Sequence, residues 1–250
     1  MYEEITPYEL TPDFLAKNLN SMSITIQETC KRFEDYGFEF KWTPTIWLNM
    51  IATIIDTHPD AEELVHNSLF IHRLYDTMSS ITWAMVSVYS AGYESALRDL
   101  RFWSEDITQV YYLDQELTDA TKSEKISHIA KLEKSKPRLS GTTLMKKCVM
   151  DERLKHEFIE IFRSLSKYVH PTEKMERNPQ NASEYDWGIS EKRFRLCIDF
   201  HRKVYDCITA LILSTYSIAF MNHEDGLMPL ILQLINQAEF PVSKSLLGLD

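Results

Sequence analysis

Glycine is scarce in this chain, and its scarcity restricts the folds that the chain can adopt. Only 6 of the 250 residues are glycine, about a third of the usual share near 7%. Hairpin-rich sheets and glycine-rich phosphate loops need more, because their turns place residues at positive φ. Neither GxGxxG nor GxxxxGK occurs, which excludes the commonest nucleotide-binding loops. The chain is therefore expected to be all-α, since helices joined by polar turns need little glycine.

Apolar residues recur every three or four positions along most of the chain, which is the pattern of helices with one buried face. Two long stripes, over residues 68–90 and 94–113, are separated by Gly92. A turn is favoured there, because glycine costs about 1 kcal/mol in a helix interior. A third stripe runs from Ser190 to about His223. These stripes predict a multi-helix bundle with long antiparallel core helices, in a single domain that covers all 250 residues.

Capping residues and prolines predict further helix boundaries. Thr11-Pro12-Asp13 is expected to begin the first helix and Thr43-Pro44 the second. Residues 152–169 form an amphipathic helix that His170-Pro171 should end. A charged helix over residues 122–133 is expected to bury the stripe formed by Ile126, Ile129 and Leu132.

The two ends of the chain are expected to differ from its middle. Residues 1–66 are interpreted as an N-terminal helical subregion, and the tail beyond Pro241 is expected to be loosely held. The most apolar segment, Cys207–Met221, has 15 residues, fewer than the roughly 20 that a membrane-spanning helix needs. It is interpreted as a buried core helix, so no membrane span is expected.

The net charge and the spacing of the cysteines indicate which partners, cellular compartment and cofactors to expect. The net charge of −10 argues against a broad basic surface for nucleic acids, although a local basic cleft stays compatible with it. The four cysteines are widely spaced, without a CxxC pair, and no signal peptide is recognised. They are interpreted as reduced thiols of a cytoplasmic protein. No metal site and no cofactor are expected, because neither the cysteines nor the histidines have ligand spacing.

The first candidate site is a charged cluster in the second long stripe. Arg98, Arg101 and Glu105 lie at helical separations beside apolar residues, where charged side chains need partners. One interpretation is an ion-pair network that fixes helix packing. The other is an anion or phosphate site, lined by Arg98 and Arg101 and oriented by Glu105.

The second candidate site lies at the end of the helix over residues 152–169. Arg163, Lys167 and His170 share one helix face at i, i+4 and i+7, and Tyr168 lies away from it but adds a hydroxyl. One interpretation is that His170 caps the C-terminus of the helix, and that Arg163 and Lys167 form a basic face exposed to solvent. The other is an acid or base, because a helix C-terminus favours protonated histidine.

The order of helix, Gly-Tyr turn, helix and a later Arg and His six residues apart resembles the HEPN superfamily of helical bundles. Many members are metal-independent ribonucleases that act as dimers, with the two motifs meeting at the interface. The resemblance implies a core over about residues 68–222, in which Arg163 stabilises charge on the scissile phosphate and His170 is the acid or base. The sequence departs from the family pattern at Ser164, where Asn, Asp or His is usual, and its spacing is at the upper limit.

Two classes of function therefore stay open. The first is a HEPN-like protein that acts on RNA or a nucleotide as a homodimer, with Arg98, Arg101 and Glu105 converging on the Arg163–His170 site. The second is a non-enzymatic helical scaffold or partner-binding protein, in which the arginines are structural.

Other side chains are assigned to the core or to the surface. The aromatic residues Trp42, Trp47, Tyr111 and Tyr112 can stack on bases, but helical spacing favours core positions. Trp103 and Phe162 are expected to be buried. Asp114 and Glu116 lack ligand geometry and are interpreted as parts of a solvated face.

Overall fold

The computed structural model describes residues 12–134, 141–169, 189–221 and 228–249. These residues form twelve helices and no strand, which confirms the predicted all-α bundle. The helices are α1 (Pro12–Arg32), α2 (Phe38–Thr57), α3 (Ala61–Asn67), α4 (Leu69–Tyr89), α5 (Tyr93–Glu116), α6 (Lys122–Lys134), α7 (Gly141–Met145), α8 (Glu152–Val169), α11 (Glu191–Thr215), α12 (Ser217–Met221), α13 (Met228–Gln237) and α14 (Pro241–Leu246).

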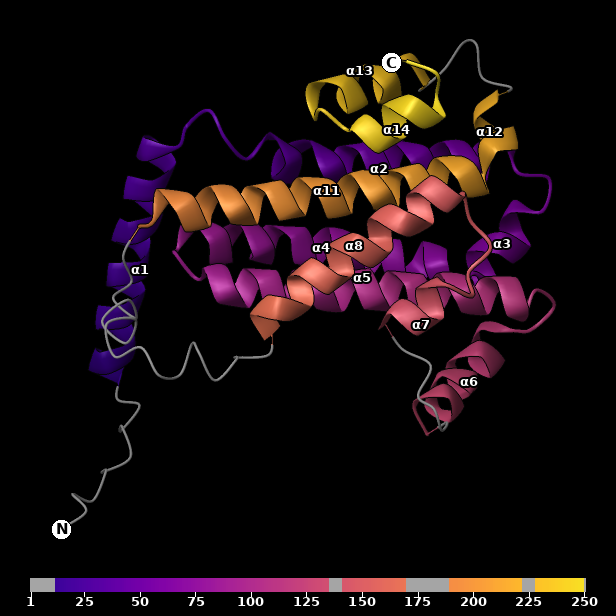
Figure 1. Cartoon of the computed structure of the whole chain (residues 1–250), viewed down its shortest axis with the longest axis horizontal. Helices are drawn as coiled ribbons and strands as arrows, with labels where there is room; N and C mark the ends of the chain where they lie inside the picture. The colour runs from indigo at the N-terminus through magenta and orange to yellow at the C-terminus, as the bar shows by residue number, and fades with distance from the viewer. Residues whose placement is uncertain (1–11, 135–140, 170–188, 222–227, 250) are drawn as a thin grey trace.

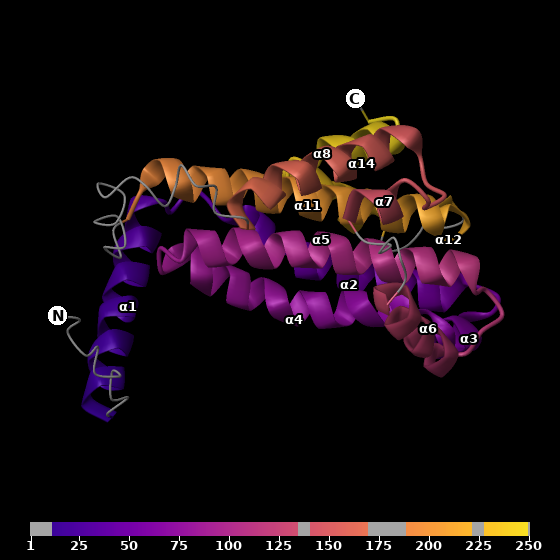
Figure 2. The same ribbon diagram turned by 60° about the horizontal axis from the view of Figure 1, so that its bottom comes forward.

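The long helices form the body of the bundle. Helices α4 and α5 are antiparallel neighbours joined by residues 90–92, and α11 packs along α5, α2 and α8 (Figure 1). Figure 2 shows α8, α11 and α14 on one side of the α4–α5 hairpin. Helix α1 projects from one end of the bundle, and α3, α6 and α12 lie at the opposite end.

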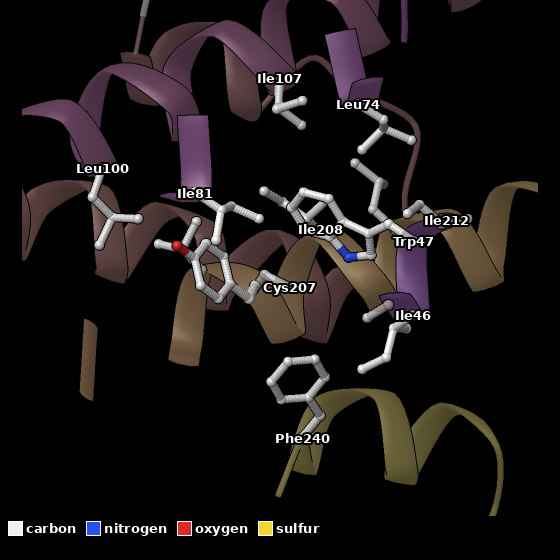
Figure 3. Close-up of a cluster of buried hydrophobic side chains, with 14 of the residues drawn as sticks. Ile46, Trp47, Leu74, Ile81, Leu100, Ile107, Cys207, Ile208, Ile212 and Phe240 are labelled. Atoms are coloured by element: carbon white, nitrogen blue, oxygen red, sulfur yellow. The ribbon is translucent and has the colours of Figure 1, made fainter. Parts of the chain in front are cut away.

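The core is built from the inward faces of α2, α4, α5 and α11. Trp47 of α2 is fully buried and lies among side chains from these helices, together with Phe240 from the segment before α14 (Figure 3). Its indole Nε1 donates a hydrogen bond to Thr209 Oγ1 at 2.9 Å, so this buried donor is satisfied within the apolar core.

The turn between α4 and α5 lies where the sequence predicts it, but a different residue adopts the left-handed conformation. Ala91 has a φ of +64°, whereas Gly92 has a φ of −79°. The Gly92 amide donates to Ser87 O at 2.7 Å and the Ala91 amide to Val88 O at 3.2 Å, the two bonds of a Schellman motif. Glycine fits at position 92 because a Cβ there would lie 3.1 Å from Ser87 O.

Several predicted boundaries agree with the structure, and two do not. Helix α2 begins at Phe38, so the predicted start at Thr43-Pro44 is wrong and Pro44 lies inside the helix. Gly37, with a φ of +90°, precedes this helix; a Cβ on it would clash with the Tyr89 hydroxyl. The stripe predicted to reach His223 is divided instead, because α11 ends at Thr215 and α12 follows.

The predicted loose tail is wrong over residues 241–249. These residues include helix α14, which packs on α11. Buried Asp206 of α11 accepts hydrogen bonds from the Val242 amide at 2.7 Å and from the Ser243 amide at 2.8 Å. A helix begins with amides that have no partner inside the helix, and here a carboxylate distant in sequence supplies their acceptors.

Burial agrees with the sequence analysis for most of the core positions that it named. Phe162 is buried at 7% exposure, as predicted, but Trp103 is only partly buried against the core. Residues 207–213 of the predicted buried helix Cys207–Met221 are buried, but α11 ends at Thr215 and Ile218 of α12 is 74% exposed, so the prediction is correct only for the first half of this segment. In the described part of the chain, every helix is too short or too polar to cross a membrane.

Stability should decrease with acid because of one fully buried histidine. His201 Nδ1 lies 2.7 Å from Cys197 O, and the ring lies against Phe40 and Tyr205. Burial lowers the pKa of His201 to about 4, whereas an unfolded histidine titrates near 6.5. Between these values the unfolded chain binds a proton that the folded chain excludes. The free energy of unfolding should therefore fall by about 3 kcal/mol as the pH drops from about 6.5 to 4.

Urea unfolding from pH 7 to pH 4.5 measures this dependence. His201→Phe, which keeps a ring at this position, should make the dependence shallower than in the unmodified protein. His156→Phe replaces an exposed histidine of α8 and is the matched control. Equal pH dependence in all three proteins would contradict the prediction.

Candidate functional site

The first predicted cluster joins three helices. Arg101 and Glu105 of α5 form an ion pair at 3.5 Å. The Arg101 Nε donates to Ser166 Oγ at 3.2 Å, and its guanidinium lies 4.6 Å from the centre of the Phe162 ring, both on α8. Glu105 Oε1 accepts the Gly141 amide of α7 at 2.9 Å. These contacts support the interpretation of Arg101 and Glu105 as a packing network.

The other predicted site residues lie outside this network of contacts. Arg98 is exposed on α5. Arg163 is exposed on α8 and pairs with Glu160 at 2.6 Å, and Lys167 is exposed on the same helix. Tyr168 is turned toward α11, where its ring meets Phe200 edge-on with centroids 6.0 Å apart. His170 lies outside the described residues, so its position relative to Arg163 stays a prediction.

The candidate aromatic platform is largely part of the core. Trp47 and Tyr111 are buried, and Trp42 and Tyr112 are partly buried against the core. The Tyr111 hydroxyl donates to Val149 O at 2.9 Å. The helical spacing of these residues is therefore explained by packing.

Burial argues against nucleophilic chemistry at two of the cysteines. Burial raises the pKa of Cys148 and of Cys197 to about 12, so both thiols stay protonated at neutral pH. In the ranges that the structure describes, no three His, Cys, Asp or Glu side chains are grouped as they would need to be to hold a metal ion.

A cavity of about 500 Å³ opens at the end of the bundle where α3, α6 and α12 lie (Figure 1). Its wall combines the α3–α4 junction, the end of α5, the start of α6 and the end of α11. The lining residues are His58, Asp60, Glu63, Leu64, Asn67, Ser68, Phe70, Tyr111, Asp114, Gln115, Thr118, Lys125, Thr215 and Tyr216.

An ion pair between Asp114 and Lys125 lies in this wall. Lys125 is 3% exposed, and its Nζ donates to Asp114 Oδ1 at 3.0 Å and to Asn67 O at 2.9 Å. Asp114 also accepts the Ser68 hydroxyl at 2.7 Å and the amides of Leu69 and Phe70 at 3.0 and 2.9 Å. This carboxylate therefore caps the start of α4, where the amides lack partners within the helix and the helix dipole favours negative charge.

These contacts correct two predictions from the sequence. Asp114 is a partly buried cap and not part of a solvated face, because four donors from the start of α4 and from α6 surround it. Helix α6 buries Lys125, whereas Ile126 of its predicted apolar stripe is 50% exposed. Ile129 of the same stripe still packs against the core, so α6 buries only part of the predicted stripe together with Lys125. The Lys125 ammonium can be buried because it finds the carboxylate it needs on α5.

Aromatic rings form the apolar part of the wall. Phe70 and Tyr111 pack edge-to-face with centroids 5.4 Å apart, and His58 meets Tyr216 edge-on at 6.5 Å. Burial raises the pKa of Tyr216 and of Tyr111 above the ordinary tyrosine value. Both hydroxyls stay protonated at neutral pH, so these rings bring no negative charge to the cavity.

Sequence reasoning missed this cavity because its residues come from four separate stretches of the chain, within 58–70, 111–118, 125 and 215–216. Only one local signal points to it: Ser68 has the side chain of an N-cap, and its hydroxyl accepts the Ile71 amide at 3.1 Å. Nothing in the spacing links Ser68 to Asp114 or to Lys125.

The chain has no match among known protein families, curated proteins or solved structures. The structure itself shows an all-α bundle, and a cavity with a polar and aromatic wall lies among its described residues. The HEPN resemblance stays a prediction.

Proposed function

We propose that this protein is a non-enzymatic helical binding protein whose ligand occupies the cavity between α3, α5, α6 and the end of α11. The cavity itself carries the proposal. Its volume of about 500 Å³ lies within the range of roughly 300–1,000 Å³ that small-molecule sites have. Apolar rings and several hydroxyl, amide and charged groups converge on it, the composition of a pocket that orients a ligand.

The buried ion pair in the wall supports the same proposal. Replacing a buried ion pair with apolar side chains is often neutral or stabilising. In a bundle without a ligand site, the Lys125–Asp114 pair would therefore add little to the free energy of unfolding. The pair keeps the cavity wall polar and holds the ends of α4, α5 and α6 in fixed positions.

Filling the cavity tests this proposal. Ligands from a panel of anionic, neutral and cationic small molecules should raise the melting temperature of the unmodified protein. Leu64→Trp, which places a larger side chain in the wall, should reduce this increase. Leu48→Trp, at an exposed position of α2 outside the cavity wall, is the control. Absence of any stabilising ligand, or equal stabilisation of both variants, would count against the proposal.

The HEPN-like ribonuclease is the second candidate function. The observation that favours it is the exposure of Arg163 and Lys167 on α8, because an RNA-directed site must be accessible. The Glu160 carboxylate beside Arg163 weakens it, since it already neutralises the guanidinium. On this proposal the protein is a homodimer whose two motifs meet.

An RNA cleavage assay with purified protein tests this second candidate. Arg163→Ala and His170→Ala should both abolish cleavage, and light scattering should report a dimer. Arg195→Ala is the matched control and should leave cleavage unchanged, because Arg195 is an exposed arginine of α11 that pairs with Glu191 of its own helix and lies outside the motif. Equal cleavage by the unmodified protein and by both motif variants would identify a contaminating nuclease.

A further inference from the structure

The charges of the cavity do not balance. Three carboxylates and one ammonium group line it. Lys125 and Asp114 neutralise each other at 3.0 Å. The Asp114 carboxylate also accepts hydrogen bonds from the amides at the start of α4. Asp60 and Glu63 are exposed at the α3 side, and neither forms an ion pair within the described ranges. The cavity therefore carries two carboxylates, Asp60 and Glu63, that pair with no cation of the described residues.

The position of these two carboxylates follows from the local structure. Asp60 precedes α3, and its amide donates to His58 Nδ1 at 3.2 Å. Glu63 lies in the first turn of α3. Both carboxylates therefore belong to the start of α3 and line the cavity.

The aromatic rings in the cavity wall also favour a positively charged ligand. Phe70, Tyr111 and Tyr216 line the cavity beside the carboxylates. The face of an aromatic ring attracts a cation through its quadrupole, with its largest effect when the cation is partly desolvated. An anion would meet two carboxylates that have no ion-pair partner among the described residues, and the one ammonium group is already paired.

We infer that the ligand of this cavity is a small organic cation. Its ammonium group lies between Asp60 and Glu63, and its apolar body lies against Phe70 and Tyr216. This inference rests on the proposed binding function, and it names the ligand class of the same site.

Three molecules of similar size separate the ligand classes by isothermal titration. They are 2-phenylethylamine as the cation, 2-phenylethanol as its neutral counterpart and 3-phenylpropanoate as the anion. We expect the amine to bind most tightly, and its affinity to fall as the salt concentration rises. Tighter binding of the alcohol or of the carboxylate than of the amine would overturn the inference.

Charge-removing variants identify the carboxylates responsible. Glu63→Gln and Asp60→Asn should each weaken amine binding about two- to fivefold and leave alcohol binding unchanged. Glu62→Gln is the matched control, because Glu62 is the neighbouring exposed carboxylate of α3 and lies outside the cavity wall. Equal effects of Glu62→Gln and Glu63→Gln would also overturn the inference, since the charge would then act only at long range.

The failure of the inference is distinguishable from that of the proposed function. If the alcohol and the amine bind equally and Leu64→Trp blocks both, the cavity binds ligands but does not select cations. If none of the three molecules binds and no ligand of the wider panel stabilises the protein, the binding function itself is overturned.

Discussion

Asp114→Ala should lower the free energy of unfolding by about 3–5 kcal/mol, the usual effect of breaking a buried ion pair. The substitution leaves the Lys125 ammonium buried without its carboxylate and removes the acceptor of the Leu69 and Phe70 amides. Urea unfolding at neutral pH measures the loss. Because the network joins α4, α5 and α6, hydrogen exchange should also accelerate at the start of α4.

Two further variants test this explanation. Glu116→Ala removes an exposed carboxylate of the same helix and should change stability by less than about 0.5 kcal/mol. Lys125→Met should cost less than Asp114→Ala, because Asp114 keeps its bonds to Ser68 and to the two amides. If Asp114→Ala costs no more than Glu116→Ala, the network does not hold this end of the bundle.

Asp206→Ala should release helix α14 and lower the free energy of unfolding by about 2–4 kcal/mol, since buried donors without partners cost about 1–3 kcal/mol each. The Asp206 carboxylate accepts the amides of Val242 and Ser243 and also the Ser243 hydroxyl at 2.6 Å. Burial raises the pKa of Asp206, and the hydrogen bonds from Ser243 and Val242 oppose this rise.

Limited proteolysis and amide exchange at Val242 and Ser243 report the release directly. Asp199→Ala, at an exposed position of the same helix that pairs with Arg202, is the control. Cleavage near residue 240 should become faster in Asp206→Ala only. If both variants keep the tail protected, α14 is held by its apolar contacts and not by the carboxylate.

Capping residues and apolar periodicity predicted helix positions well where a helix boundary depends only on a few neighbouring residues. Ser68 and Ser190 cap α4 and α11 with their hydroxyl groups, as their positions before apolar stripes indicate. The predicted turn after α4 is present, although Ala91 and not Gly92 adopts positive φ. Local signals failed at Pro44, because proline indicates a helix start only when nothing upstream already forms one.

The candidate site was much less predictable. The sequence identified Arg101 and Glu105 as charged residues that need partners, but not that the partners are Ser166, Phe162 and the Gly141 amide. Apart from the N-cap residue Ser68, the sequence contained no indication of the cavity, because the other lining residues are ordinary in their own segments. Whether a charged residue binds a ligand or stabilises helix packing depends on which groups of other helices face it.

By itself, the sequence determined that this chain is helical and where most of its helices lie, since glycine scarcity, capping and apolar periodicity act within a few neighbouring residues. Only the tertiary structure decided which charged side chains are buried. Lys125, Asp114 and Asp206 are polar in any periodicity pattern, yet each is buried or nearly so. A charge enters the interior only where another element brings it a partner, and that pairing is a property of the packed bundle.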